Sequence, residues 1–373
     1  MHHTATHFKK RRQKLRKGHS SSALSLRKGS ALLVTNENNV RYLTGFTGDS
    51  SYLIIDASGD TLISDPRYEE QIAQQCPGLD CHIRLPSERL LDVSAELLRR
   101  RGYGTVFVEG DHLSVTAYRH LEQAGLPLEA SSGEVERLRQ IKDAGEIAIL
   151  RRAVRIAEDV FTSIRAQLTS QMSEIDVANE LERQIRNLGG SGCSFDPIVA
   201  GGPRAALPHA TPTEAKIGDS PLLLIDWGAT FSGYRSDLTR VLLTSKIPAK
   251  IVKAYEAVLA AQQAAIAAMK PGVKVREIDA VAREVIADAK MAKQFNHGLG
   301  HGIGLDIHES PLMGSSYDDT LAAGMVVTVE PGIYFPNLGG IRIEDDVLIT
   351  ADGCERLSTL PRDRAANTVD LIF

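Results

Sequence analysis

The chain has 373 residues, of which 43% are hydrophobic and 24% are charged, and its formal net charge is −4 at pH 7. This composition is typical of a soluble globular protein and excludes a disordered or fibrous chain, while the length suffices for two domains. The charge provides no broad basic surface, so we expect neither a nucleic-acid nor a membrane partner. Because no run of about 18 apolar residues and no secretory signal are present, we expect a cytoplasmic location.

A basic tail occupies residues 1 to about 20. Its lysines and arginines cluster without any acidic residue among them, at Lys9, Lys10, Arg11, Arg12, Lys14, Arg16 and Lys17. We expect a solvated tail or a basic first helix here, and a weak contact with a polyanion is the alternative.

Short strands and helices alternate up to about residue 130, which is typical of a small α/β domain. The apolar run 31–34 predicts a strand that ends at the turn-prone residues 35–39. A helix is predicted to begin at Asp65, which can cap it, and Pro66, which fits the first turn. The other predicted elements are strands at 50–56, 60–65 and 105–109 and helices at 67–75, 89–101 and 114–124.

The pattern changes after the small residues 131–133. Apolar residues at helical spacing among many charges predict two amphipathic helices over 133–171. We therefore expect an N-terminal α/β domain at 1–132 and a second domain at 133–373. The fold class is α/β (α+β).

The second domain is predicted to contain two long β-hairpins that carry acids inside apolar strands. Its elements, in chain order, are strands 221–229 and 235–244 around a turn at 231–234, helices 249–269 and 275–289, and strands 325–335 and 340–350 around a loop at 336–340. Asp226 and Asp237 lie on the first hairpin, and Glu330 and Glu344 lie on the second. Such acids are costly to desolvate unless they are paired or bound to a cation.

Four converging carboxylates would repel one another and hold protons unless divalent cations compensated them. Oxygen donors with a single imidazole favour manganese, cobalt, iron or zinc in a two-metal site. The imidazole can come from His301 in the glycine-rich segment 297–304, because glycines let the backbone approach a ligand closely. Simpler alternatives are a turn residue for Asp226, an ion pair with Arg235 or Arg240 for Asp237, a solvated acidic turn for Glu344, and an ordinary loop position for His301.

Several stretches resemble the pita-bread metallopeptidase family, in its proline-directed branch of Xaa-Pro dipeptidases (prolidases) and Xaa-Pro aminopeptidases. In chain order they are NVRYLTGFTG, LISDPRY, PHATP, LIDWGATFSGYRSDLTR, HGLGHGIGLDIHESP, VVTVEPGIYF and GGIRIEDDVLIT. The set covers nearly the whole chain. The resemblance implies a small N-terminal creatinase-like α/β domain and a C-terminal pita-bread catalytic domain.

The resemblance also implies a role for each metal-site residue. Asp226 matches a terminal ligand of one metal. His301 and Glu330 match ligands of the other metal. Asp237 and Glu344 match the two carboxylates that bridge both metals.

Three histidines and an arginine complete the implied site. His209, His297 and His308 match the family's substrate and transition-state histidines. Arg342 precedes Glu344 by two residues, so strand alternation would put both side chains on one face. The simpler alternatives are a loop histidine for His209, a helix cap for His297, an ion pair with Glu309 for His308, and an outward surface charge for Arg342.

The implied activity is hydrolysis of the bond between an N-terminal residue and proline, so the expected partner is a peptide with proline at its second position. The implied cofactors are two divalent metal ions, with manganese preferred and cobalt, zinc or iron as alternatives. A hydroxide that bridges them would attack, and Glu330 would shuttle a proton to the leaving nitrogen. His308 and His209 would stabilise the oxyanion or hold the proline, and His297 would orient the substrate.

The modest N-terminal domain leans towards a dipeptidase rather than an aminopeptidase, and family members imply a homodimer. The alternatives are a methionine-aminopeptidase-like enzyme and a noncatalytic pita-bread binding protein. The segments NVRYLTGF and PHATP favour the proline branch. The complete ligand set disfavours both the noncatalytic protein and the metal-free creatine hydrolases of this fold.

Overall fold

The computed structural model describes residues 4–18, 24 and 26–369. The chain forms two compact units that part between Arg139 and Gln140. This division lies seven residues beyond the boundary expected from the sequence, because residues 133–139 pack with the first unit. There the Tyr42 hydroxyl donates to the Leu138 carbonyl at 3.1 Å, and Arg139 donates to the Asn39 side chain at 2.8 Å.

The first unit is built on a six-stranded mixed sheet in the order β4-β3-β2-β1-β5-β6. Its strands are β1 Ser30–Val34, β2 Tyr52–Asp56, β3 Asp60–Ser64, β4 Asp80–Ile83, β5 Thr105–Glu109 and β6 Leu128–Ser131. Its helices are α1 Ala5–Lys17, α2 Glu37–Thr44, α3 Glu69–Gln75, α4 Leu90–Arg101, α5 Val115–Gln123 and α6 Glu136–Arg139. One face of the sheet packs on α4 and α5 through alternate apolar residues such as Leu33, Ile54 and Val106.

The prediction of a turn at residues 35–39 is wrong, because α2 begins inside it. The Asn36 side chain accepts hydrogen bonds from the backbone N–H groups of Asn38 and Asn39 and so caps the helix. Burial of Val40 and Leu43 then stabilises the helix by tertiary packing. The residues that indicated a turn are therefore the start signal of a helix.

The basic first segment is a helix, and its arginines are used inside the protein. Arg12 donates to the Leu43 carbonyl at 2.6 Å and to Asp60 at 2.7 Å. Arg16 donates to the Asp56 carbonyl at 2.6 Å. These contacts anchor α1 and leave less of its charge for a polyanion. The rest of the predicted tail, residues 1–3, 19 and 20, lies outside the described residues.

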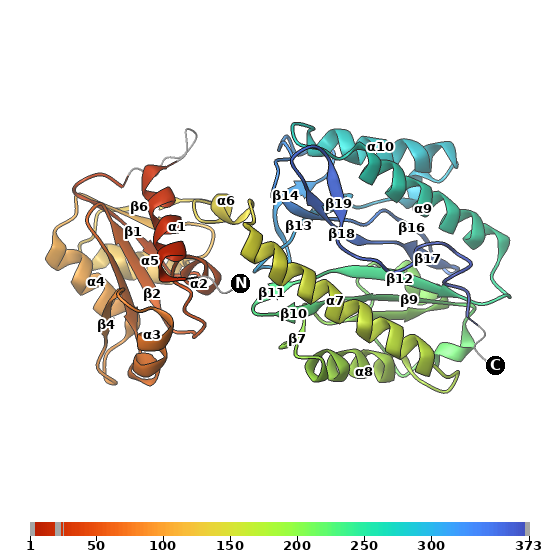
Figure 1. The fold of residues 1–373 in the computed structure, drawn as a ribbon, viewed down its shortest axis with the longest axis horizontal. Helices are drawn as coiled ribbons and strands as arrows, with labels where there is room; N and C mark the ends of the chain where they lie inside the picture. Colours follow the sequence, from red (N-terminus) through yellow and green to blue (C-terminus); the bar gives the residue numbers. More distant parts are fainter. Residues whose placement is uncertain (1–3, 19–23, 25, 370–373) are drawn as a thin grey trace. The chain divides into compact units, whose positions relative to one another are not determined.

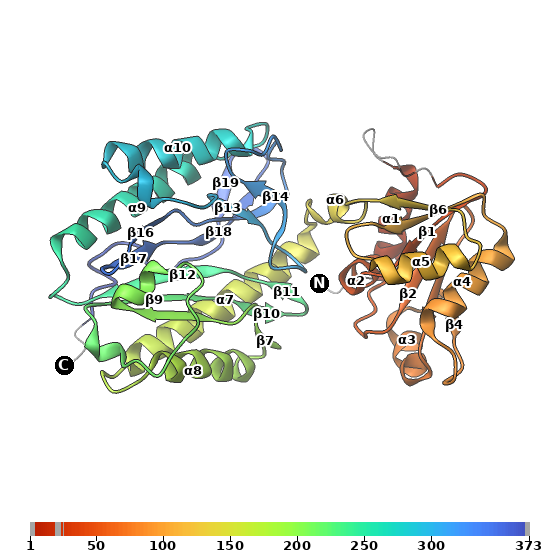
Figure 2. The same cartoon turned by 180° about the vertical axis from the view of Figure 1, so that it is seen from behind.

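The second unit places two helix pairs on opposite sides of a layer of strands, with α7 and α8 on one side and α9 and α10 on the other (Figures 1 and 2). The helices are α7 Ala144–Gln167, α8 Glu174–Asn187, α9 Ala249–Ala268 and α10 Val275–Asp288. The strands before α9 are β7 Gly192–Cys193, β8 Ile198–Gly201, β9 Leu222–Trp227, β10 Ala229–Phe231, β11 Tyr234–Arg235 and β12 Leu238–Leu243. Those after α10 are β13 Gly300–Gly302, β14 Glu309–Met313, β15 Val326–Val329, β16 Gly332–Phe335, β17 Gly339–Arg342, β18 Asp345–Ile349 and β19 Cys354–Arg356.

The second predicted hairpin is real, but each of its arms is broken into two strands. β15 pairs with β18 and β16 pairs with β17, in two different sheets. The breaks fall at Glu330, which precedes Pro331, and at Glu344, which forms an isolated bridge to Thr239. Pro331 cannot donate to a strand ladder, so the chain bends there. Arg342 and Glu344 are consequently not on one uninterrupted strand, contrary to the prediction.

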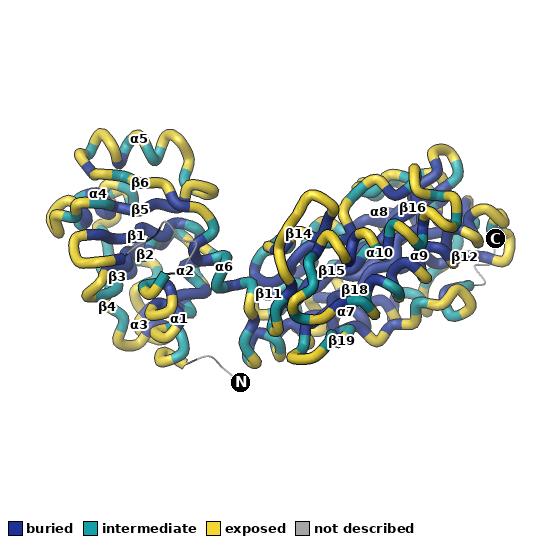
Figure 3. Tube along the Cα trace, turned by 90° about the horizontal axis from the view of Figure 1, so that it is seen from above, coloured by how far each residue is buried: buried dark blue, intermediate teal, exposed yellow. Residues whose placement is uncertain are grey.

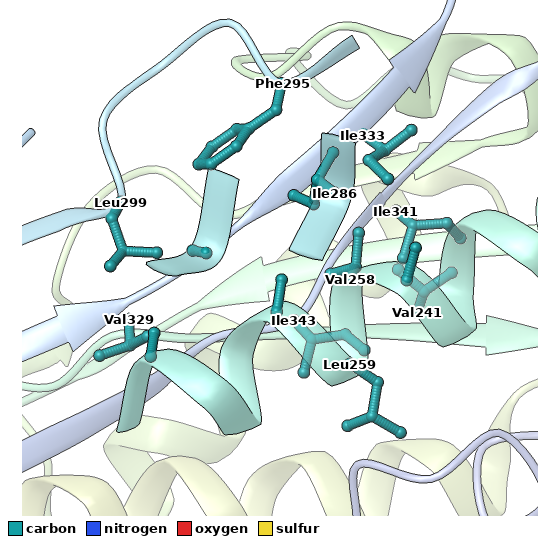
Figure 4. Close-up of a cluster of buried hydrophobic side chains, with 14 of the residues drawn as sticks. Val241, Val258, Leu259, Ile286, Phe295, Leu299, Val329, Ile333, Ile341 and Ile343 are labelled. Carbon is teal, nitrogen blue, oxygen red and sulfur yellow. The ribbon is translucent and has the colours of Figure 1, made fainter. Parts of the chain in front are cut away.

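Most strands of the second unit are buried, whereas β14 and β19 are partly exposed (Figure 3). Figure 4 shows Val258 of α9 and Ile286 of α10 close to Ile333 and Ile341 of the β16–β17 hairpin. This apolar packing holds the strand ends in place, so that polar side chains can project from them. Among the described residues, no helix combines the length and apolar character needed to cross a bilayer.

Candidate metal centre

One pocket of about 600 Å³ lies within the second unit. Its lining includes all nine predicted site residues: His209, Asp226, Asp237, His297, His301, His308, Glu330, Arg342 and Glu344. They come from segments up to 135 positions apart in the sequence, as the numbers of His209 and Glu344 show. The fold therefore brings together every residue that the sequence singled out.

The two halves of the unit meet at the strand ends that bear the acids. Asp226 lies in β9 opposite Thr239 of β12, and Asp237 directly precedes β12. Thr239 in turn bridges to Glu344. A side chain at Gly300 would bring its Cβ within 2.2 Å of the Thr328 carbonyl oxygen, so only glycine permits this close approach of two strands.

Three buried residues could hold one metal ion together. The ligand atoms of Asp237, His301 and Glu344 all lie within 4.8 Å of one another. His301 Nε2 is 3.7 Å from Asp237 Oδ2 and 3.5 Å from Glu330 Oε1. An imidazole nitrogen beside several carboxylate oxygens is a donor set that suits a first-row divalent metal.

Within the described residues, two carboxylate oxygens of this centre lack the partner that a buried acid needs. Asp226 Oδ1 and Asp237 Oδ1 are buried, and neither oxygen accepts a hydrogen bond from the described part of the chain. Burial, together with the charges of Glu344 and Asp226, raises the pKa of Asp237 well above its usual range. Burial also raises the pKa of Glu344, with Glu330 and Asp226 adding to the effect. Burial raises the pKa of Glu330 to about 8, and Arg342 opposes this rise. A cation would satisfy these oxygens, so the residues fit a metal centre.

The imidazole of His301 is suited to coordination. Burial and the neighbouring His308 lower its pKa to about 4, so the ring is neutral at pH 7. Its Nδ1 is 3.0 Å from the Gly302 carbonyl oxygen, so Nδ1 carries the proton and Nε2 faces Asp237 with its lone pair. This arrangement orients one nitrogen towards the acids.

The simpler ion pairs proposed for the acids are absent from the described contacts. Arg240 binds Asp345 at 2.7 Å and not Asp237. Asp226 does pair with a cation, because Arg342 donates to its Oδ2 at 2.5 Å. Arg342 is thus buried in the pocket wall and is not an outward surface charge.

The three remaining histidines surround the acids without belonging to the compact group. His297 Nε2 is 3.0 Å from the Tyr334 hydroxyl, and burial lowers the His297 pKa to about 4. The rings of His301 and His308 meet edge to face with centroids 4.3 Å apart. Glu309 pairs with Lys142 at 3.1 Å. His209 and His308 are exposed at the pocket surface, where a substrate can reach them.

Three residues near the acids escaped the sequence analysis. The Tyr334 hydroxyl accepts from Arg342 at 2.8 Å and lines the pocket. The Thr239 hydroxyl donates to Glu344 at 2.6 Å, and Asp346 accepts from the Asp237 backbone N–H at 3.0 Å. Thr239 and Asp346 each follow a predicted ligand by two positions, and that alternation could have revealed them.

Family models match both units. The description "Metallopeptidase family M24" fits residues 148–351, and "Creatinase/Prolidase N-terminal domain" fits residues 11–141. The first match covers more than half of the chain and contains the whole metal centre. The chain belongs to metallopeptidase family M24. It is therefore a metal-dependent peptidase with a creatinase-like N-terminal domain and a pita-bread catalytic domain, as predicted.

M24 relatives extend over nearly the whole chain. The uncharacterized peptidase YqhT of Bacillus subtilis is 38% identical, over 89% of this chain and 94% of the relative. Among solved structures, an Xaa-Pro dipeptidase from Bacillus anthracis is 35% identical with a TM-score of 0.89, covering 96% of this chain and 99% of that one. An X-Pro aminopeptidase from Thermotoga maritima is 34% identical with a TM-score of 0.83, covering 95% and 99%.

Proposed function

We propose that this M24 enzyme is an exopeptidase that hydrolyses the bond between an N-terminal residue and proline, with two divalent metal ions. The observation that carries the proposal is the buried cluster of Asp237, His301 and Glu344, flanked by Asp226 and Glu330. Relatives that bear the names Xaa-Pro dipeptidase and X-Pro aminopeptidase cover nearly the full chain, which supports the specificity for proline.

The proposed ligands divide between the two metals as the family resemblance implies. Asp226 would hold one metal, His301 and Glu330 the other, and Asp237 and Glu344 both. Bound there, the cations would lower the pKa of a water molecule and neutralise charge that develops on the attacked carbonyl. Manganese is the metal we expect first, with cobalt, zinc or iron as alternatives.

Glu330 is the proposed proton carrier of the site. Its carboxyl lies 3.5 Å from His301 and lines the pocket, where it can take a proton from water and pass it to the leaving nitrogen of proline. Thr328 donates to the same carboxyl at 3.5 Å and orients it. The nitrogen of proline must gain a proton before it leaves, because an unprotonated amide nitrogen is a poor leaving group.

The histidines and Arg342 would handle the substrate. His209 and His308 are exposed at the pocket surface and could donate to the oxyanion or hold the proline. His297 is held by Tyr334 and could orient the peptide. Arg342 keeps Asp226 in position. The acids would also bind the free N-terminal amine, which accounts for exopeptidase action.

The experiment is to assay the purified chain with an Xaa-Pro dipeptide and an Xaa-Pro-Yaa tripeptide, before and after chelation, and after manganese, cobalt or zinc is restored. We expect chelation to abolish turnover and metal to restore it. Hydrolysis of Met-Ala-type peptides in preference to Xaa-Pro peptides would favour the methionine-aminopeptidase-like alternative. A chain that binds no metal and cleaves no peptide would favour the noncatalytic one. The homodimer and the cytoplasmic location stay predictions.

A further inference from the structure

The pocket wall has an apolar part that the proposed chemistry does not use. Phe195 and Pro197 line it from the segment before β8, and Ile307 and Leu312 line it from the segment around β14. Leu312 and the nearby lining residue Tyr317 are 37% and 39% exposed, so this part lies at the mouth of the pocket. Exposed apolar side chains that rim a pocket are a common mark of ligand contact.

The charges of the lining leave no positive group for a substrate carboxylate. Besides the four predicted acidic ligands, Asp196 also lines the pocket. Arg342 is the only lysine or arginine in the described lining. Five carboxylates against one guanidinium amount to a formal charge of −4, which two divalent cations would bring to zero.

Arg342 is not available to bind a substrate carboxylate. Its three nitrogens donate to Asp226, to the Tyr334 hydroxyl at 2.8 Å and to the Thr239 hydroxyl at 3.2 Å. The side chain is 3% exposed. A carboxylate that claimed this guanidinium would have to displace Asp226 from it.

A dipeptide and a longer peptide differ at this point in the pocket. In an Xaa-Pro dipeptide the charged carboxylate is bonded to the Cα of proline, and so lies only about 3–4 Å from the attacked carbonyl carbon. That position is inside the pocket, where an unpaired charge is costly. In a longer peptide the same atoms form a neutral amide, and the chain continues towards the apolar mouth. The volume of about 600 Å³ lies within the about 300–1,000 Å³ of sites that enclose drug-sized ligands, so a third residue has room.

We propose that the substrates of this site are peptides that continue beyond the proline, with the following residue lying against the apolar wall of Phe195, Leu312 and Tyr317. This inference rests on the proposed function. It favours an aminopeptidase over a dipeptidase, whereas the small size of the N-terminal domain had favoured a dipeptidase.

The test compares three matched substrates with the full manganese-loaded chain: Ala-Pro, Ala-Pro amide and Ala-Pro-Ala. Ala-Pro amide has the size of the dipeptide but no carboxylate, so it separates charge from length. We expect kcat/KM for the amide and the tripeptide to exceed that for the free dipeptide by about tenfold to hundredfold. Burial of the unpaired carboxylate charge should lower kcat/KM for the dipeptide by at least this factor.

A charge introduced at the mouth provides a second measurement. Leu312→Arg should improve cleavage of free Ala-Pro relative to Ala-Pro amide by about tenfold, since a charge-assisted hydrogen bond contributes that much. Leu312→Gln is the matched neutral control and should leave the ratio as in the parent enzyme. Position 312 is exposed, so the fold should tolerate both substitutions.

The outcomes separate the two proposals. If the parent enzyme cleaves Ala-Pro as well as its amide and Ala-Pro-Ala, the inference is overturned while the proposed function stands. Selective loss of Ala-Pro cleavage in His209→Gln would also overturn it, because that histidine would then be the carboxylate's partner. If none of the three peptides is cleaved with any metal, the proposed function itself is refuted.

Discussion

Thr239 donates its hydroxyl to Glu344 Oε2 at 2.6 Å and thereby ties the first hairpin to the second at the metal centre. The same hydroxyl accepts from Arg342 Nε at 3.2 Å. One buried side chain thus orients a proposed bridging ligand and the arginine that holds Asp226. Groups that orient metal ligands in this way tune affinity for the metal.

Substitution of Thr239 should weaken metal binding without removing a ligand. We expect Thr239→Val to lower manganese affinity by about tenfold to hundredfold, because Glu344 loses its donor. Thr239→Ser keeps the hydroxyl and should retain most of the affinity. Titration calorimetry on the chelated chain measures both variants. Equal affinities in the two variants would show that the hydroxyl has no orienting role.

Removal of a proposed bridging acid should abolish catalysis. Asp237→Ala is expected to lower kcat/KM on an Xaa-Pro peptide at least about a thousandfold, since metal clamps supply several kcal/mol to the transition state. Metal content, measured by mass spectrometry, should fall as well. Asp318→Asn changes an exposed acid outside the pocket and serves as the matched control. Near-normal turnover in Asp237→Ala would contradict the assignment.

A buried ion pair next to the centre should matter far more for stability than an exposed one. Arg240 and Asp345 are both fully buried, and Arg240 also donates to the Glu344 carbonyl at 2.7 Å. Asp345→Asn leaves the guanidinium without its charge partner and should cost about 3–5 kcal/mol in the free energy of unfolding. Breaking the exposed Arg151–Glu355 pair with Arg151→Ala should cost at most about 1 kcal/mol. Urea denaturation of the two variants gives the comparison, and similar losses would refute it.

The metal-free enzyme should lose stability as the pH rises above neutrality. Glu330 has a folded-state pKa of about 8 against an ordinary value of 4.5, so its contribution to stability is complete below 4.5 and is lost as the pH approaches 8. Asp237 and Glu344 shift in the same direction. His297 and His301 have pKa values lowered from 6.5 to about 4. Their contribution to stability therefore rises with pH between about 4 and 6.5, opposite to that of the acids. The clearest window is therefore pH 6.5 to 8.

Thermal melting in this window provides the measurement. With a chelator present, the melting temperature should fall between pH 6.5 and 8. Saturating manganese should remove most of that fall, because the cation compensates the ionised carboxylates. A metal-free melting temperature that is flat or rising across the window would contradict the raised pKa values.

Local signals in the sequence, together with the family resemblance, singled out residues that line one pocket. An acid inside an apolar strand, as at Asp226, is informative on its own because desolvation makes it costly. Strand alternation linked Arg342 to Glu344, and both do line the pocket although the strand is interrupted between them. The strands around Asp226 and Glu330, and helices α9 and α10, lie where the apolar pattern predicted them.

Tertiary packing decided what the local pattern left open. Helix α2 formed from turn-prone residues because Val40 and Leu43 found a core to bury in. Arg240 forms its ion pair with Asp345, so it does not compete with a metal for Asp237. No sequence pattern chooses among several possible partners, since the choice depends on distances in the folded chain.

The sequence by itself singled out which acids are candidates for a metal centre, because the cost of burying a charge is a local property of residue type and strand pattern. The tertiary structure alone decided that Asp237, His301 and Glu344 meet within 4.8 Å and that Arg342 is committed to Asp226. The convergence of these ligands and the balance of their charges depend on segments that are far apart in the chain. Neither is determined until those segments fold together.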